Sequence, residues 1–360
     1  MAAHASKDLL RAQFVGKGLY QVATPAAVLD LAKVEANCNL MLDAAQRLNL
    51  SWRAHIKTHK TIELTRLQVG DQASTPVNIV VFTLAEAENV VPLLKEYQQR
   101  TRQVNCVDRL AAISAQLGPN GLTIMVDHSD QLKYLTSLAS KSGHPPPVFL
   151  KINVGNDRAG GCWVGILLAT NWSASCVRGC RILCLSGGLY SRQPVVRNPR
   201  RLGGIGISRA RAQLFTIYAI RKERPHHPLV LSAGATPTVS CLQHPSFAET
   251  DPQSTGPNVD TITDKLSNLI QDLRRNNFVL EVHAGVHPTL DLQQLAAHSR
   301  DSRLLSPAAI AISALVEVCS LYPGRGPNGT TEALINAGTL ALAREPCVDK
   351  GNPPGQHLNN

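Results

Sequence analysis

The sequence is poor in aromatic residues and has no long apolar run. Only 4% of its 360 residues are Phe, Trp or Tyr, although 44% are apolar in total. An interior built mainly from Ala, Leu and Val suits an α/β protein better than an aromatic-rich β-sandwich. No stretch reaches transmembrane length, the N-terminus lacks the apolar segment of a secretory signal, and the nine cysteines show no repeated spacing. We therefore expect a cytoplasmic protein with reduced thiols and no membrane partner.

Acidic residues are missing from one long segment. Between Arg158 and Lys222 there is no Asp or Glu, but there are eleven basic residues, ten of them Arg. The net charge of +10 comes from this segment, because the rest of the chain holds 25 basic and 26 acidic residues. Few aromatics lie nearby, and no nucleic-acid-binding motif is found. This distribution argues against a nucleic-acid partner.

Between residues 24 and 160, segments with strand character alternate with amphipathic helical segments, and the connections are short. This alternation predicts a parallel sheet with crossover helices. The number of units favours an α/β fold of the (β/α)8 TIM-barrel type, with an open doubly wound sheet as the alternative. The predicted strands lie in residues 26–32, 78–84, 122–128, 147–154 and 277–285, and residues 51–58 and 226–238 each read as a strand running into a loop or turn. The first predicted helices are 33–50, 84–100 and 129–143.

The pattern changes near residue 298. We place a barrel at 20–298 and an incomplete β-rich domain at 299–346, where two longer apolar stretches have β character and no helix lies between them. Residues 347–360 are polar and rich in Pro and Gly, which predicts a disordered tail. Within the barrel, residues 161–213 fit neither a strand nor a helix pattern, so this segment is atypical and a candidate for poor order.

The stretch RAHIKTHKT (53–61) concentrates two histidines, two lysines and an arginine. His55 and His59 are four residues apart, as are His283 and His287. On a helix such a pair can bind zinc, but no HExxH-type Glu follows and both pairs lie at predicted strand ends. Hydrogen-bonded histidines near a barrel mouth are the preferred interpretation, and a metal site is the alternative.

Lys57 is the candidate reactive residue of this stretch. It alternates with His55 and His59, so all three side chains point the same way if the strand continues. At the carboxyl end of a barrel strand that direction is toward the active site. A lysine desolvated there among cationic neighbours would lose its proton readily and become a nucleophilic amine. A solvated basic surface is the alternative.

Two other segments add chemistry to this picture. SAGATPT (232–238) follows an apolar strand, and its small residues and threonine hydroxyls suit a phosphate group, although an ordinary turn is equally compatible. KINVGNDRAG (151–160) ends a strand with Arg158, which taken alone could be a structural ion-pair partner. An amine, an arginine and a phosphate-binding turn on one barrel fit pyridoxal 5′-phosphate, whose aldehyde and phosphate lie at opposite ends.

The sequence resembles the D-serine dehydratase-like group of fold-type III pyridoxal-phosphate enzymes, which also includes D-threonine aldolases. The resemblance covers roughly residues 20–345, and RAHIKTHKT is its most specific motif. It implies a barrel of the alanine racemase N-terminal type followed by a β domain. The matching pieces, in the family's order, are TPAAVLDL, RAHIKTHKT, FTLAEAE, MVDHSDQL, KINVGNDRAG, GLYS, LSAGATPT, LEVHAG with DLQQ, SLYPG and LINAGTLAL.

The resemblance also implies roles for individual residues. Lys57 matches the Schiff-base lysine that also removes the substrate's α-proton. Arg158 matches an arginine beside the cofactor ring's hydroxyl, and Tyr190 a tyrosine that borders the cofactor. Gly234 and Thr236 match the phosphate-binding turn. The implied reaction is β-elimination from D-serine to give pyruvate and ammonia, in a homodimer, with zinc assisting the departure of the hydroxyl.

The sequence departs from this family at several points. The family's β domain carries a His-x-Cys zinc pair, and no His-x-Cys occurs here, so we assign no metal ligands. Arg192 stands where the family has a histidine, and Val286 and His287 stand where it has Asn-Tyr. Residues 161–213 match poorly apart from GLYS. A D-threonine aldolase-like lyase and a truncated, catalytically impaired cofactor-binding barrel therefore stay as alternatives.

Overall fold

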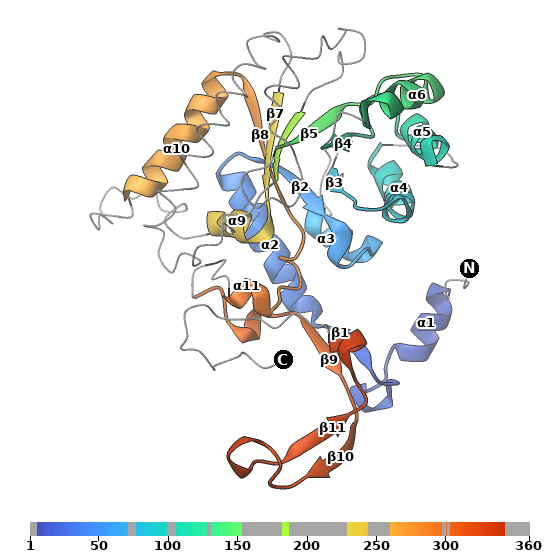
Figure 1. Cartoon of the computed structure of the whole chain (residues 1–360), viewed down its shortest axis with the longest axis vertical. Coiled ribbons are helices and arrows are strands. Elements are labelled where there is room, and N and C mark those ends of the chain that lie inside the picture. Colours follow the sequence, from blue (N-terminus) through green and yellow to red (C-terminus); the bar gives the residue numbers. More distant parts are fainter. Residues whose placement is uncertain are drawn as a thin grey trace.

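A computed structural model describes residues 6–70, 77–98, 106–127, 131–152, 182–186, 229–243, 260–296, 300 and 303–342. Its centre is a seven-stranded parallel sheet with the order β3-β2-β8-β7-β6-β5-β4 (Figure 1). The strands are β2 (Ser51–His55), β3 (Asn78–Val80), β4 (Ile124–Val126), β5 (Val148–Ile152), β6 (Ile182–Ser186), β7 (Leu229–Gly234) and β8 (Phe278–Ala284).

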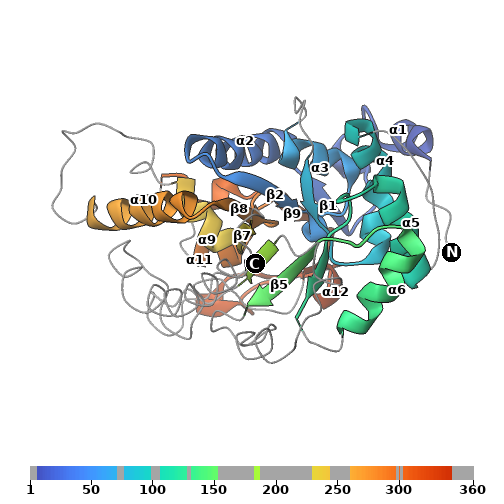
Figure 2. The ribbon, with the colours of Figure 1, turned by 90° about the horizontal axis from the view of Figure 1, so that it is seen from above.

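Helices cover the outer side of this sheet (Figure 2). The first of them begins where the Asp30 carboxylate accepts a hydrogen bond from the backbone N–H of Lys33 (3.2 Å), which caps its first turn. The helices are α2 (Leu31–Arg47), α3 (Ile62–Val69), α4 (Leu84–Gln98), α5 (Cys106–Leu117), α6 (Leu132–Ser142), α9 (Thr236–Ser240), α10 (Asp260–Arg275) and α11 (Leu292–Ala296). A core cluster joins α2 and α9 to β8 and comprises Met41, Ala44, Val239, Leu242, Val282 and Ala284.

The strand order identifies the fold type. Consecutive strands are neighbours, and β8 returns to pair with β2, which is the cyclic order of a TIM-type barrel and not the reversed order of a doubly wound sheet. The α/β barrel-type prediction is confirmed at this level. The prediction of a closed eight-stranded barrel is wrong for the described residues, in which β3 and β4 are sheet edges. The physical reason is the passage from α4 to α5, where no described strand intervenes to pair with both edges.

Strand β6 was not predicted. It lies within residues 161–213 and pairs in parallel with β5 on one side and β7 on the other. The apolar run ILCLS was the available signal, but its arginine- and cysteine-rich surroundings obscured it. The rest of residues 161–213 lies outside the described residues, as does the predicted tail at 347–360.

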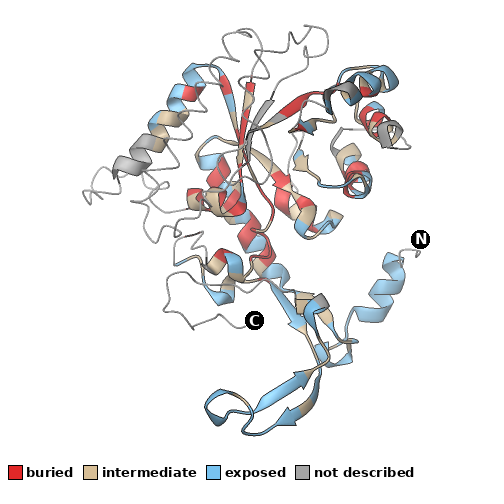
Figure 3. Cartoon of the chain, in the orientation of Figure 1, coloured by how far each residue is buried: buried red, intermediate tan, exposed pale blue. Residues whose placement is uncertain are grey.

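Two small antiparallel sheets complete the described part. β1 (Ala26–Leu29) pairs with β9 (Ile312–Leu315), and β10 (Val318–Tyr322) pairs with β11 (Glu332–Ile335). The β character predicted after residue 300 is thus confirmed, although the short helix α12 (Thr339–Leu342) follows β11. Helix α1 (Lys7–Phe14) and the β10–β11 hairpin are exposed over most of their length (Figure 3).

None of the described helices is both long and apolar enough to cross a lipid bilayer.

Candidate active site

Lys57 lies in a tight turn at the carboxyl end of β2. The strand ends at His55, and Ile56–Thr58 form a 3-10 helix. Ile56 is fully buried, and its carbonyl accepts hydrogen bonds from the backbone N–H groups of His59 (3.2 Å) and Lys60 (2.8 Å). The strand ends at His55, so the condition under which His55, Lys57 and His59 would all point the same way is not met, because the N–H groups of His59 and Lys60 pair within the turn. Lys57 is half-buried in this turn.

The two histidines that flank Lys57 are hydrogen-bonded. His55 Nδ1 lies 3.1 Å from the carbonyl oxygen of Val80 and donates to it. His59 Nδ1 accepts from the backbone N–H of Thr61 (3.1 Å), so its Nε2 carries the proton and donates to Oε1 of Gln68 (2.9 Å). Burial lowers the pKa of His59, which keeps the ring neutral. The interpretation of this pair as hydrogen-bonded histidines is confirmed.

The two histidines of the second pair, His283 and His287, differ in their hydrogen bonding. His283 Nδ1 lies 2.9 Å from Oγ of Ser232. His287 is fully buried, packs edge-on against Trp52 with ring centroids 5.3 Å apart, and has no hydrogen-bond partner for its ring nitrogens among the described residues. The hydrogen-bonded interpretation therefore holds for His283 and is wrong for His287, whose environment is an aromatic packing contact.

The mouth of the sheet brings His55 and His283 together on one face. Burial first, and then the nearby basic groups His55, Arg53 and Lys151, together lower the pKa of His283 to about 4. Burial, followed by the charge of Lys57, lowers the pKa of His55 to about 4 as well. Both imidazoles are thus neutral at neutral pH. Because His55 donates from Nδ1, its Nε2 has a lone pair that can accept a hydrogen bond.

A buried ion pair lies on the same two strands, two residues before His55 on β2 and two residues before His283 on β8. Arg53 Nε lies 2.7 Å from Oε1 of Glu281, and the two side chains are only 14% and 2% exposed. The guanidinium carbon also lies 5.0 Å from the ring centroid of Phe149. This pair links β2 to β8 through their side chains.

The predicted phosphate-binding turn lies at the end of β7. A Cβ on Gly234 would come within 2.2 Å of His283 Nε2, so only glycine leaves room for that imidazole. Oγ1 of Thr236, a buried residue, accepts hydrogen bonds from the backbone N–H groups of Gly285 (3.2 Å) and Val286 (3.0 Å). The hydroxyl proton of Thr236 stays available for donation, and no described residue accepts it.

These residues fit pyridoxal phosphate. The turn that carries Lys57 follows β2, the Gly234–Thr236 turn follows β7, and β8 lies between the two strands. The carboxyl ends of β2 and β8 lie close together, because a Cβ on Gly285, just after β8, would lie 2.7 Å from the carbonyl oxygen of His55 at the end of β2. Lys57 and the Thr236 hydroxyl therefore lie at the same mouth of the sheet.

Not every predicted site residue can be placed. The structure brings Lys57, Gly234 and Thr236 to the same end of the sheet, whereas Arg158 and Tyr190 lie outside the described residues. Within the described ranges, no group of three or more His, Cys, Asp or Glu side chains is arranged to hold a metal ion. Zinc therefore has no assigned ligands in this part of the chain.

Sequence reasoning missed the partners inside the mouth. It did not assign Ser232, Glu281 or Gln68 a role, and it treated His283 only as one half of a histidine pair. A signal was present in β8, where Glu281 and His283 alternate and so share the face opposite the buried Val282. Two ionisable residues on the same face of an otherwise apolar barrel strand indicate an interior polar site.

The fold and the mouth define a barrel protein of the alanine racemase type. The alanine racemase N-terminal domain family matches residues 29–168. D-threo-3-hydroxyaspartate dehydratase from Delftia sp. HT23 superposes with a TM-score of 0.59 at 21% identity, covering 91% of this chain and 75% of that one. D-threonine aldolase from Filomicrobium marinum gives a TM-score of 0.57 at 18% identity, covering 89% and 74%. Because both proteins are less than 25% identical to this chain, their structural similarity is evidence for the fold alone.

Sequence similarity to curated proteins identifies the family within this fold type. D-serine dehydratase from Schizosaccharomyces pombe is 33% identical over 357 residues, which cover 95% of this chain and 77% of that protein. D-serine dehydratase from Saccharomyces cerevisiae is 27% identical, covering 94% and 78%. The chain belongs to the D-serine dehydratase family of fold-type III pyridoxal-phosphate proteins.

Proposed function

We propose that this chain is a pyridoxal-phosphate-dependent lyase that converts D-serine to pyruvate and ammonia. The observation that carries the proposal is the placement of Lys57 at the carboxyl end of β2, beside a mouth with the neutral imidazoles of His55 and His283. The 33% identity to a D-serine dehydratase supports the choice of reaction. Elimination removes the α-proton and the β-hydroxyl as water, and hydrolysis then takes up one water and releases ammonia.

Each residue has a defined task in this proposal. The cofactor, when bound, supplies the electron sink for the α-carbon. Lys57 Nζ holds the cofactor aldehyde and accepts the α-proton. The Thr236 hydroxyl donates to the phosphate, and Gly234 leaves space for His283 beside it. The Nε2 lone pair of His55 can orient a substrate donor without adding charge.

Two alternatives are tested alongside. A D-threonine aldolase from an Arthrobacter species is 28% identical over 145 residues, or 40% of this chain, which supports an aldolase as the second candidate. Such an enzyme would release glycine and acetaldehyde from D-threonine. A non-catalytic cofactor-binding barrel is the third candidate, because no His-x-Cys pair occurs in this sequence.

A homodimer is also proposed. Its support is the β10–β11 hairpin, where Val318 is 54%, Leu321 62% and Leu334 51% exposed, since several exposed apolar side chains on one short hairpin are typical of an interaction surface. Sedimentation velocity at several protein concentrations tests this. A single monomeric species at every concentration would contradict it.

The decisive experiment compares two charge-matched lysine variants, Lys57→Arg and Lys60→Arg. Arginine keeps the positive charge but forms no stable imine with an aldehyde. The purified proteins are incubated with pyridoxal phosphate, reduced with borohydride and mapped by peptide mass spectrometry. We expect a reduced adduct on Lys57 in the parent chain and in Lys60→Arg, and none at that position in Lys57→Arg.

Product release then identifies the reaction. Pyruvate and ammonia from D-serine, but not L-serine, are expected in the parent chain and in Lys60→Arg, with assays run both with and without added zinc. Glycine and acetaldehyde from D-threonine in place of pyruvate would make the aldolase the function. An adduct on Lys57 without turnover of either substrate in either condition would leave a cofactor-binding barrel.

A further inference from the structure

We propose that His59 is a positioning residue for Lys57, and that its ring holds the turn that presents the cofactor lysine. The inference rests on the proposed function of Lys57 and adds a role for a residue that does not touch the reacting atoms. It is carried by the hydrogen bonds of both ring nitrogens, which connect the lysine turn to the helix that follows it.

The first connection lies within the turn. Thr61 is the N-cap residue of α3, and its backbone N–H donates to His59 Nδ1 at 3.1 Å. The carbonyl of Ile56 accepts from the N–H groups of His59 and Lys60 at the start of the same turn. The chain from Ile56 to Thr61 is therefore folded back on itself by three hydrogen bonds, and the imidazole closes its far end.

The second connection ties the ring to α3 and back to β2. His59 Nε2 donates to Oε1 of Gln68, which is fully buried near the end of α3. The backbone carbonyl of Gln68 accepts a hydrogen bond from the indole N–H of Trp52 at 2.8 Å. Because Trp52 lies on β2, hydrogen bonds connect β2 to α3 through Gln68, and α3 to the lysine turn through His59.

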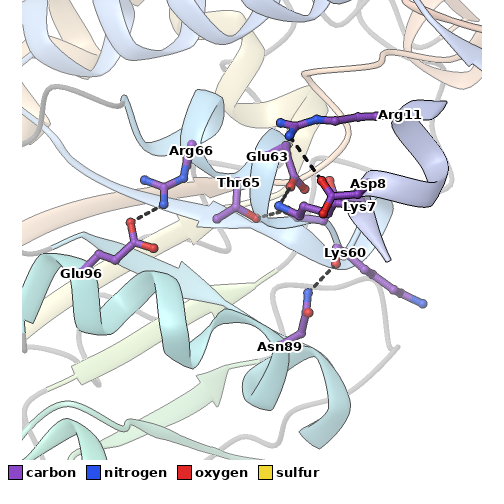
Figure 4. Close-up of polar contacts among 10 residues, drawn as sticks. Lys7, Asp8, Arg11, Lys60, Glu63, Thr65, Arg66, Asn89 and Glu96 are labelled. Atoms are coloured by element: carbon purple, nitrogen blue, oxygen red, sulfur yellow. Dashed lines mark hydrogen bonds and ion pairs between the residues drawn. The ribbon is translucent and has the colours of Figure 1, made fainter. Parts of the chain in front are cut away.

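A third contact fixes the other side of the turn. Asn89 on α4 donates to the carbonyl oxygen of Lys60 at 2.9 Å, and Lys60 has a φ of 59°, a region that few residues other than glycine adopt (Figure 4). An ion pair between Arg66 and Glu96 joins α3 to α4 nearby (Figure 4). The turn is thus held between the two helices, and the His59 contacts form its buried side.

This arrangement matters because a lysine side chain is long and flexible. Its backbone must direct the amine toward the cofactor aldehyde, and a shift of about 1 Å in a reacting group can cost about 100-fold in rate. Only the neutral Nε2-protonated tautomer of His59 both accepts from Thr61 and donates to Gln68. The buried environment, which lowers the pKa of His59, selects the neutral form.

The experiment compares His59→Ala, His59→Asn and His59→Gln. Asparagine places an acceptor near the Nδ1 position and so keeps the bond to Thr61, whereas glutamine places a donor near Nε2 and keeps the bond to Gln68. Asn37→Ala is the control, because Asn37 on α2 is buried and donates side-chain hydrogen bonds to the carbonyls of Pro288 (3.2 Å) and Ala309 (3.1 Å), which lie outside the turn.

The readouts are the rate of borohydride-trappable adduct formation on Lys57, the visible absorbance of the lysine–cofactor adduct, and the unfolding temperature. We expect His59→Ala to slow adduct formation about 100-fold at temperatures well below its unfolding transition. His59→Asn should recover most of that rate, and His59→Gln less. Asn37→Ala should lower the unfolding temperature and leave the trapping rate unchanged.

Two results would overturn the inference: trapping on Lys57 at the parent rate in His59→Ala, or an equal loss of rate in Asn37→Ala. If His59→Ala does not fold, the comparison of the Asn and Gln variants decides, and parent rates in both would overturn it. Absence of any adduct on Lys57 in the parent chain is a different result, because it contradicts the proposed function itself.

Discussion

His283 Nδ1 and Ser232 Oγ lie 2.9 Å apart, so the carboxyl ends of β8 and β7 are joined by side chains inside the mouth of the sheet. The imidazole also lies directly against the Cα of Gly234. The position of His283 therefore depends on Ser232 and Gly234 of the neighbouring strand. We expect a change at either residue to move His283 and so to weaken cofactor binding.

Replacing Gly234 tests this dependence. In Gly234→Ala the new Cβ would lie 2.2 Å from His283 Nε2, so the imidazole must move. We expect a loss of about 1 to 3 kcal/mol in the free energy of unfolding, as for other overpacked sites, together with weaker cofactor binding. Urea unfolding and cofactor titration by absorbance measure both. Gly338→Ala is the control, because a Cβ there meets no atom within 4 Å.

Thr236 can be tested with an isosteric substitution. Thr236→Val removes the hydroxyl that accepts from the N–H groups of Gly285 and Val286, leaving these donors without that partner. An unsatisfied buried donor costs about 1 to 3 kcal/mol. Thr236→Ser keeps the hydroxyl and should retain both stability and phosphate affinity. Equal affinity of the Val and Ser variants for pyridoxal phosphate would show that the hydroxyl does not contact the phosphate.

The buried ion pair predicts a large difference between two similar substitutions. Glu281→Gln leaves the charge of Arg53 unpaired in the interior, and removing one partner of a buried pair costs about 3 to 5 kcal/mol. Glu332→Gln breaks a surface pair with Arg325 whose N···O distance is 2.8 Å and whose side chains are 49% and 63% exposed. Exposed pairs contribute at most about 1 kcal/mol. Urea unfolding should therefore show a larger loss in the free energy of unfolding for Glu281→Gln than for Glu332→Gln. Similar losses in the two variants would show that the Arg53–Glu281 pair is not a buried ion pair.

The histidines predict how stability depends on pH. The pKa of His55 and that of His283 fall from 6.5 to about 4 in the folded chain, mainly because both are buried. Between these values the unfolded chain binds more protons, so stability is fully present above about pH 6.5 and is lost as the pH falls toward 4. Each histidine contributes a slope of about 1.4 kcal/mol per pH unit.

His283→Asn isolates one of these contributions. Asparagine can still bond to Ser232 but does not titrate in this range. Urea unfolding at about pH 5 and pH 6 should give a slope smaller than that of the parent chain by about 1.4 kcal/mol per pH unit. An unchanged slope would mean that His283 does not lose its proton on folding.

Sequence patterns predicted the local features well where the signal was periodic or strongly biased in composition. The apolar positions of residues 33–50 predicted a helix, and α2 buries Val34, Cys38 and Met41 from that set. The same reasoning failed at β6, because a single five-residue apolar run among arginines and cysteines carries no periodicity to measure. Nor could it decide whether the strand continues as far as Lys57, since the point at which a strand ends and a turn begins depends on where the neighbouring strands end.

The sequence by itself determined the parallel barrel-type sheet, the family resemblance and Lys57 as the candidate anchor, because these depend on alternation and on motifs contiguous in the chain. Only the tertiary structure decided that Lys57 lies in a turn held by His59, that Arg53 pairs with Glu281, and that His283 meets Ser232. The last two contacts join residues 228 and 51 positions apart. Such partners are selected by the pairing of β2, β7 and β8 in space, and no local pattern of residues records that pairing.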